Sequence, residues 1–271
     1  MRLLIGAARV LIIVPLIVLG VVPVLLLGLV PARYRGARLS AWFTTLLTRA
    51  FNRVFNIRFR NTNPERFARH HGLIFPNHSS YLDIIALMNT APVRFLAARE
   101  VKGQWLIGRF AAALETVFVD RSSSQSRRSA RRSISEQLRR DPFPPIAIFP
   151  EGKLDPGDQL YAFRRGAFEL AIQNEVPYLP CALRYNRPDV VTWYGGLRNE
   201  SLVAAVWRLA CHRGRITVEL IPLDPVHPSR ADDPTLLAAV AQRSIEQVLG
   251  FPPSPTDANA PLLRPARAKA K

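Results

Sequence analysis

The segment GLIFPNHSSYLDIIALMN, residues 72–89, contains three successive patterns that decide how the chain folds around it. GLIF is a short apolar run of the kind that forms a buried strand. PNHSS has the proline, asparagine and serine content of a turn, and YLDIIALMN spaces its apolar residues as a helix does. The sequence therefore predicts a strand, a turn that carries His78, and a helix whose first coil contains Asp83.

The spacing of His78 and Asp83 fits this layout and no continuous helix. Two residues five apart on one helix lie about 140° apart around its axis, so their side chains would point from different faces. The residues alone leave two interpretations open. Ser80 and Asp83 fit a capping box, in which the carboxylate closes the start of the helix. Alternatively, Asp83 contacts the imidazole of His78.

Short apolar runs alternate with helical patterns from residue 56 onward. This alternation predicts an α/β domain, with a mostly parallel central sheet flanked by helices. The expected strands are 72–75, 93–97, 116–120, 145–150, 177–183 and 215–223, and the expected helices are 82–89, 126–140, 164–174 and 232–249.

The N-terminal region predicts a membrane-anchoring helix. Residues 10–30 carry no charge, and a helix of this length can cross roughly 30 Å of hydrocarbon. No small-residue cleavage site follows, so we interpret residues 1–31 as a retained anchor rather than a signal peptide. Pro15, Gly20 and Pro23 predict either a kinked span or a re-entrant pair of half-helices.

Basic residues dominate the charge of the chain. The formal net charge is +17 and the isoelectric point is near 11.2, which favours an anionic membrane surface as a partner. Arginines are more numerous after the anchor than before it, so the positive-inside rule places the following domain in the cytoplasm, at the cell membrane. Residues 32–55 are expected to contain a basic amphipathic helix, lying at the membrane surface or packed on the main domain.

The rest of the chain is expected to contain one main domain and a tail, without a nucleic-acid-binding arm, a metal cluster or a disulfide framework. We expect residues 56–250 to form the main domain and residues 251–271 a disordered basic tail. The arginine-rich segment 121–133 has no aromatic residues for base stacking, so no nucleic-acid partner is expected. Cys181 and Cys211 show neither metal-ligand spacing nor a disulfide framework.

Four short blocks follow predicted strands, where α/β sheets present their ligand sites. They are NHSSYLD (77–83), VFVDR (117–121), FPEGK (149–153) with FRRGAF (163–168), and VPYLP (176–180). In this order the blocks resemble the glycerolipid acyltransferase family, whose best-known members are 1-acyl-glycerol-3-phosphate acyltransferases. The segment AAREVKGQWLIG (97–108) resembles the basic stretch of that family, and the resemblance covers roughly residues 55–225.

The resemblance implies a role for each residue of the dyad. His78 is expected to be the general base that takes the proton of an acceptor hydroxyl, because an unperturbed histidine titrates near neutral pH. Asp83 is expected to fix the tautomer of His78 and to stabilise the imidazolium that forms. A protein nucleophile is not needed, since the lipid hydroxyl attacks directly.

The resemblance also implies a site for the acceptor. Arg121 matches a phosphate-contacting arginine of the family, and Glu151 and Gly152 match its glutamate–glycine block. The block commonly continues with threonine, arginine and serine, but this chain continues with Lys153, Leu154 and Asp155. Lys153, Arg164 or Arg165 would have to supply the missing positive charge.

The expected reaction is transfer of a fatty acyl group from acyl-CoA or acyl-carrier protein to the free hydroxyl of 1-acyl-glycerol-3-phosphate, giving phosphatidic acid. Another lysophospholipid or a lyso-aminolipid is the alternative acceptor. A lipid or thioester hydrolase is less favoured, because the chain has no Gly-x-Ser-x-Gly elbow. A basic membrane-tethered binding protein is a third interpretation. No metal and no cofactor is expected, since the acyl donor is a co-substrate.

Overall fold

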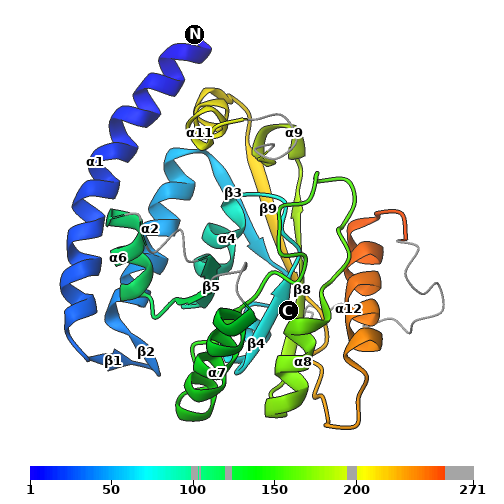
Figure 1. Cartoon of the computed structure of the whole chain (residues 1–271). Helices are drawn as coiled ribbons and strands as arrows, with labels where there is room; N and C mark the ends of the chain where they lie inside the picture. The colour runs from blue at the N-terminus through cyan, green and yellow to red at the C-terminus, as the bar shows by residue number, and fades with distance from the viewer. Residues whose placement is uncertain (99–102, 104, 120–123, 194–199, 254–271) are drawn as a thin grey trace.

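A computed structural model describes residues 1–98, 103, 105–119, 124–193 and 200–253 (Figure 1). Its main feature is a seven-stranded sheet in the order β3-β9-β8-β4-β7-β5-β6. Neighbouring strands are parallel except for β8 and β9, so the predicted mostly parallel α/β fold is confirmed. The strands are β3 (Ile57–Asn61), β4 (Leu73–Pro76), β5 (Arg94–Ala98), β6 (Val117–Val119), β7 (Ile146–Ala147), β8 (Tyr178–Tyr185) and β9 (Ile216–Pro222).

The apolar runs form strands because both of their faces are buried. In β4, Leu73 and Phe75 point into one hydrophobic core and Ile74 into another, as the alternation of side chains along a strand requires. All six predicted strands are present. β3 was not predicted, because arginines interrupt its apolar residues. It lies at the edge of the sheet and pairs with β9 alone.

Helices cover both faces of the sheet (Figure 1). The core around Ile74 also includes residues of α4 and α11, and the core around Phe75 includes residues of α7, α8 and α12. The four helices predicted in the main domain are present, whereas α3, α6, α9 and α11 were not predicted. The helices are α2 (Leu39–Val54), α3 (Pro64–Arg69), α4 (Leu82–Thr90), α6 (Trp105–Ala113), α7 (Ser124–Arg140), α8 (Arg165–Asn174), α9 (Pro188–Val191), α11 (Leu202–Cys211) and α12 (Pro234–Leu249).

The N-terminal apolar segment forms one helix, α1 (Arg2–Leu29), which continues unbroken through Pro15 and Pro23, so no re-entrant pair of half-helices forms. Among the described residues, only α1 has the length and apolar composition needed to cross a membrane. It lies along α2 and also contacts α6 and α11. A side chain at Gly20 would collide with Leu47 of α2, and one at Gly28 with Ala113 of α6.

The two long sides of α1 have different environments. On one side Ile13, Val21 and Val24 are buried against the domain. Near the start of the helix, Arg9 donates hydrogen bonds to the carbonyl oxygens of Ala210 and His212, at 3.0 and 2.5 Å. The other side exposes a row of large apolar side chains: Leu3, Leu4, Leu11, Ile12, Val14, Val18, Leu19, Val22, Leu26 and Leu29.

A short hairpin and α2 connect α1 to the main domain. The hairpin consists of β1 (Arg33–Tyr34) and β2 (Ala37–Arg38), and Arg33 and Arg38 both form ion pairs with Glu115. α2 packs against α1, α4 and β3. Of the predicted disordered tail, the part from residue 254 onward lies outside the described residues.

Candidate active site

The turn between β4 and α4 brings His78 and Asp83 into contact. His78 Nδ1 lies 2.8 Å from Asp83 Oδ2, and the same carboxylate oxygen accepts the backbone N–H groups of Ser79 and Ser80, each at 2.9 Å. Asp83 therefore closes the start of the helix and contacts the imidazole at once. The two interpretations left open by the sequence both hold for the geometry.

The accessibility of the two side chains differs in the way that a catalytic pair requires. The side chain of Asp83 is fully buried, whereas that of His78 is 20% exposed. Because Nδ1 donates to a carboxylate, Nε2 is the ring nitrogen that carries a free lone pair. The ring of Phe149 stacks on the imidazole with 3.8 Å between the ring centroids. These contacts fix the orientation of the imidazole while leaving Nε2 able to accept a proton.

Parallel strands explain why distant residues meet at this turn. The carboxyl ends of β4, β7 and β8 lie at the same edge of the sheet, because these strands are parallel. β4 leads into the turn of His78, β7 leads towards Glu151, and β8 ends at Tyr185. The hydroxyl of Tyr185 donates to the second oxygen of Asp83, Oδ1, at 2.5 Å.

Glu151 is buried and is hydrogen-bonded to the backbone of His78. One of its carboxylate oxygens accepts the backbone N–H of His78, and the other accepts that of Tyr161, both at 2.8 Å. Burial, followed by the nearby carboxylate of Asp155, raises the pKa of Glu151 to about 9. The structure thus places Glu151 against the backbone of the dyad turn, where it fixes the position of His78.

Asp155 is a second buried acid at this position. Its backbone N–H donates to the carbonyl oxygen of His78 at 2.6 Å, and its Oδ1 accepts the N–H of Gly157 at 2.7 Å. Burial raises the pKa of Asp155 to about 7, and the charge of Asp83 adds to the effect. Glu151 and Asp155, both with raised carboxyl pKa values, are therefore neighbours of His78.

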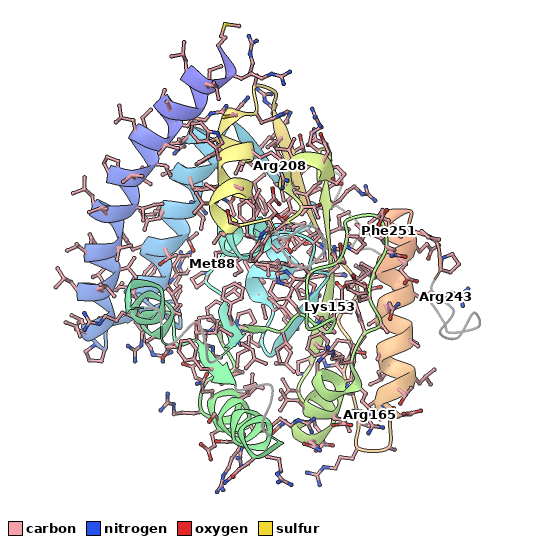
Figure 2. The ribbon with its side chains drawn as sticks, turned by 45° about the horizontal axis from the view of Figure 1, so that its top comes forward. Met88, Lys153, Arg165, Arg208, Arg243 and Phe251 are labelled. Atoms are coloured by element: carbon pink, nitrogen blue, oxygen red, sulfur yellow. The ribbon has the colours of Figure 1, made fainter. Side chains whose placement is uncertain are left out.

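The basic residues predicted to bind the acceptor lie in different places. Gly152 has a φ of 71°, a conformation that favours glycine, and a side chain there would meet the guanidinium of Arg164 at 3.0 Å. The ammonium group of Lys153 lies 3.6 Å from the ring centroid of Tyr161. Arg165 is exposed and pairs with Glu169 at 3.2 Å on α8, well away from Lys153 in Figure 2. The guanidinium of Arg164 therefore lies against Gly152 and the ammonium of Lys153 against Tyr161, whereas Arg165 pairs with Glu169.

Some predicted site residues lie outside the described residues, and three neighbours of the dyad were not predicted. Arg121 lies outside the described residues, as do residues 99–102 and 104 of the basic stretch at 97–108. Tyr185, Phe149 and Asp155 were missed as neighbours of the dyad. The only indication in the sequence is that residues Lys153–Asp155 depart from the family block. This departure indicates that an arginine is missing, but it does not predict that Asp155 is buried.

The buried Asp83 and the accessible His78 thus lie on one strand–turn–helix unit, at the carboxyl ends of the parallel strands. A family model described as Acyltransferase matches residues 58–184. The chain is 32% identical to the lyso-ornithine lipid O-acyltransferase of Pseudomonas aeruginosa, over 81% of each chain. The chain belongs to the glycerolipid acyltransferase family, so the resemblance and the enzyme class predicted from the sequence are confirmed.

Two further similarities concern proteins that act on lysophosphatidic acid. The 1-acyl-sn-glycerol-3-phosphate acyltransferase of Neisseria gonorrhoeae is 26% identical, over 65% of this chain and 69% of the relative. The crystal structure of the 1-acyl-sn-glycerophosphate acyltransferase PlsC from Thermotoga maritima superposes with a TM-score of 0.65. It covers 92% of this chain and 98% of the PlsC chain at 19% identity, which supports the fold.

Proposed function

We propose that this enzyme transfers a fatty acyl group from acyl-CoA or acyl-carrier protein to the free hydroxyl of a lysolipid, with His78 as general base. The observation that carries this proposal is the contact between the accessible imidazole of His78 and the buried carboxylate of Asp83. A base held by a buried carboxylate is suited to removing a hydroxyl proton near neutral pH.

The reaction needs one bond to form and one to break. The acceptor hydroxyl attacks the thioester carbonyl as Nε2 of His78 takes its proton, and a C–O bond forms. The imidazolium that results faces the negative charge of Asp83. The tetrahedral intermediate then collapses with cleavage of the C–S bond, and His78 returns the proton to the departing thiolate. The products are an ester and a free thiol, without a covalent enzyme intermediate.

An apolar cavity of about 310 Å³ between α1, α2 and α4 fits an acyl chain. It reaches the segment directly after Asp83, because Ile84, Ile85 and Met88 of α4 line it (Figure 2 labels Met88). The hydroxyl groups of Thr44 and Thr48 are bonded to the helix backbone, so these residues offer mainly their methyl groups. We assign this cavity to the acyl chain of a substrate.

Two acceptors are supported by separate observations. 1-Acyl-glycerol-3-phosphate, whose acylation gives phosphatidic acid, is supported by the guanidinium of Arg164 next to Gly152 and by the neighbouring Lys153. Arg121 is a further predicted contact. A lyso-ornithine lipid is supported by the similarity to the Pseudomonas enzyme and by Leu154, which occupies the position where the family commonly has an arginine. An ornithine head group carries an amine and a carboxylate instead of a phosphate.

We further propose that α1 attaches the enzyme to one leaflet of the cell membrane, with the catalytic domain in the cytoplasm. Arg9 holds the start of α1 on the domain, and its end packs on α6, so the domain lies against the helix along its length. Its exposed apolar side chains would enter the lipid, and the net charge of +17 would favour an anionic surface. Full-length protein should therefore stay with vesicles in 1 M salt and leave only with detergent. Release by salt alone would contradict this attachment.

The decisive experiment measures release of free thiol from acyl-CoA by purified protein. Each reaction is run without acceptor, with 1-acyl-glycerol-3-phosphate and with lyso-ornithine lipid, and His78→Ala serves as the control. An acyltransferase gives release that depends on an acceptor, and the preferred acceptor gives the larger kcat/KM. A hydrolase would give release without an acceptor, and a binding protein would give none.

A further inference from the structure

A tyrosine far from the dyad in the sequence completes the hydrogen bonding of Asp83. Oδ2 accepts three donors from the turn itself, whereas Oδ1 accepts the hydroxyl of Tyr185. The carboxylate is fully buried, so an oxygen without a donor would bear the full cost of desolvation. Tyr185 supplies that donor from β8, outside the four sequence blocks of the family.

The sheet holds Tyr185 in this position. The last pair of β4 with β8 is Pro76 with Cys181, and β8 continues beyond it to Tyr185. Pairing with β9 supports the extension, where Tyr185 lies opposite Val218. The turn is also tied to β8 by Asn77, whose side chain bonds both the N–H and the C=O of Leu183, at 2.7 and 3.2 Å. The extended end of β8 is therefore fixed relative to the turn.

We propose that Tyr185 is a positioning residue, which holds the carboxylate of Asp83 in the orientation that presents Oδ2 to His78. This inference rests on the proposed role of the dyad in acyl transfer. The hydroxyl acts through Asp83 and does not touch the reacting atoms. It stops the carboxylate from rotating away from the imidazole, and it occupies the oxygen that the imidazole does not use.

A neutral donor suits this position better than a cation. A lysine or arginine here would neutralise Asp83 and weaken its attraction for the imidazolium. Burial, followed by the charge of Asp83, raises the pKa of Tyr185 well above its usual value, so the hydroxyl keeps its proton. Glu151 and Asp155 place further acidic groups near Asp83, and a donor on Oδ1 helps to keep the carboxylate ionised among them.

The test compares Tyr185→Phe with Tyr178→Phe. Tyr178 lies on the same strand, and its buried hydroxyl has no hydrogen-bond partner among the described residues. For Tyr185→Phe we expect kcat to fall about 10- to 100-fold, the effect of losing one hydrogen bond to a charged group. The KM values of donor and acceptor should stay within about twofold, and Tyr178→Phe should keep the kcat of the wild type.

A double variant separates positioning from a structural effect. If Tyr185 acts through Asp83, Tyr185→Phe should cause no further loss of kcat in an Asp83→Asn protein, although each substitution alone lowers kcat. Tyr185→Phe should also move the acid limb of the kcat profile to lower pH, because a carboxylate that rotates away from the imidazole stabilises the imidazolium less.

Three results would overturn the inference: a kcat within about twofold of the wild type for Tyr185→Phe, an equal loss from that substitution in both backgrounds, or a loss shared by Tyr178→Phe. His78→Ala distinguishes this failure from failure of the proposed function. If His78→Ala remains active, the dyad mechanism is wrong. If it is inactive while Tyr185→Phe is fully active, only the role of Tyr185 is wrong.

Discussion

The turn that carries the dyad and the loop that follows β7 lie side by side but differ in how firmly they are held. In the turn, residues 75–83, the carboxylate of Asp83 has four donors, and Asn77 is bonded to β8. In the loop, residues 151–164, Glu151 and Asp155 are buried, but Lys153 and Arg164 are exposed. The proposed base is thus held by several elements, whereas the side chains of Lys153 and Arg164 are exposed.

This difference indicates how the fold divides its tasks. Proton transfer requires a base that stays within hydrogen-bond reach of the substrate, so rigidity is favoured there. Long side chains on the loop can recognise a head group, and their substitution would leave the position of His78 unchanged. Relatives that act on lyso-ornithine lipid and on 1-acyl-glycerol-3-phosphate are consistent with such a division.

The largest expected effect is loss of activity on replacement of the base. His78→Ala should lower kcat by about a thousandfold or more, because general-base catalysis contributes about 10²- to 10⁴-fold and the rest of the reaction depends on the same proton. The fold should survive, since His78 lies on a turn and is partly exposed. Activity is measured as acceptor-dependent thiol release, and circular dichroism checks the fold. A folded variant with wild-type activity would show that His78 is not the base.

Asp83→Asn should come next in size, with a loss of at least about a hundredfold in kcat. The amide has nearly the shape of the carboxylate but does not carry the charge that stabilises the imidazolium. It also has only one acceptor oxygen for the donors that now meet two. Thermal melting should therefore shift downward as well. Unchanged kcat in a folded protein would show that Asp83 only closes the helix.

Replacement of a basic residue in the loop should change binding rather than chemistry. Arg164→Ala should raise the KM of the acceptor about tenfold and leave kcat nearly unchanged, because a charge-assisted hydrogen bond is lost. Arg165→Ala is the matched control, since Arg165 is exposed and pairs with Glu169. Initial rates at varied acceptor concentration measure both. Equal effects of the two substitutions would show that Arg164 does not contact the acceptor.

The smallest expected effect concerns stability and pH. Asp155 and Glu151 have raised pKa values of about 7 and about 9, so the folded protein binds more protons than the unfolded chain above their usual values near 4. Stability from these groups is therefore fully present below about pH 4 and is lost as the pH rises to about 9.

Asp155→Asn removes one of the two ionisations and keeps an oxygen for the N–H of Gly157. Its melting temperature should fall less between pH 6 and pH 9 than that of the wild type, by a few degrees, at about 2–4 °C per kcal/mol. Asp158→Asn is the control, because Asp158 is exposed. Identical pH dependence in the wild type and Asp155→Asn would mean that Asp155 ionises freely.

The local pattern of the sequence predicted much of the fold. Short continuous apolar runs predicted the six strands, and apolar residues at the helical period predicted the four helices. They did not give β3, in which arginines alternate with the apolar residues, or α11, although Ser201 accepts a hydrogen bond from the N–H of Ala204 at its start. The order of the blocks gave the family, because each block is a short segment with its own residue types.

By itself, the sequence determined the turn that carries His78 and the helix start at Asp83, because these depend on residues within a few positions of one another. The order of its four blocks also gave the enzyme class. Only the tertiary structure decided what surrounds the dyad. Tyr185 is 102 residues from Asp83 and Glu151 is 73 residues from His78, and they meet because parallel strands bring their carboxyl ends to one edge. It also decided that α1 lies along the domain, although its apolar length alone is enough to cross a bilayer. Local periodicity reports which face of an element is apolar, whereas sheet register and helix packing choose the residues that cover it.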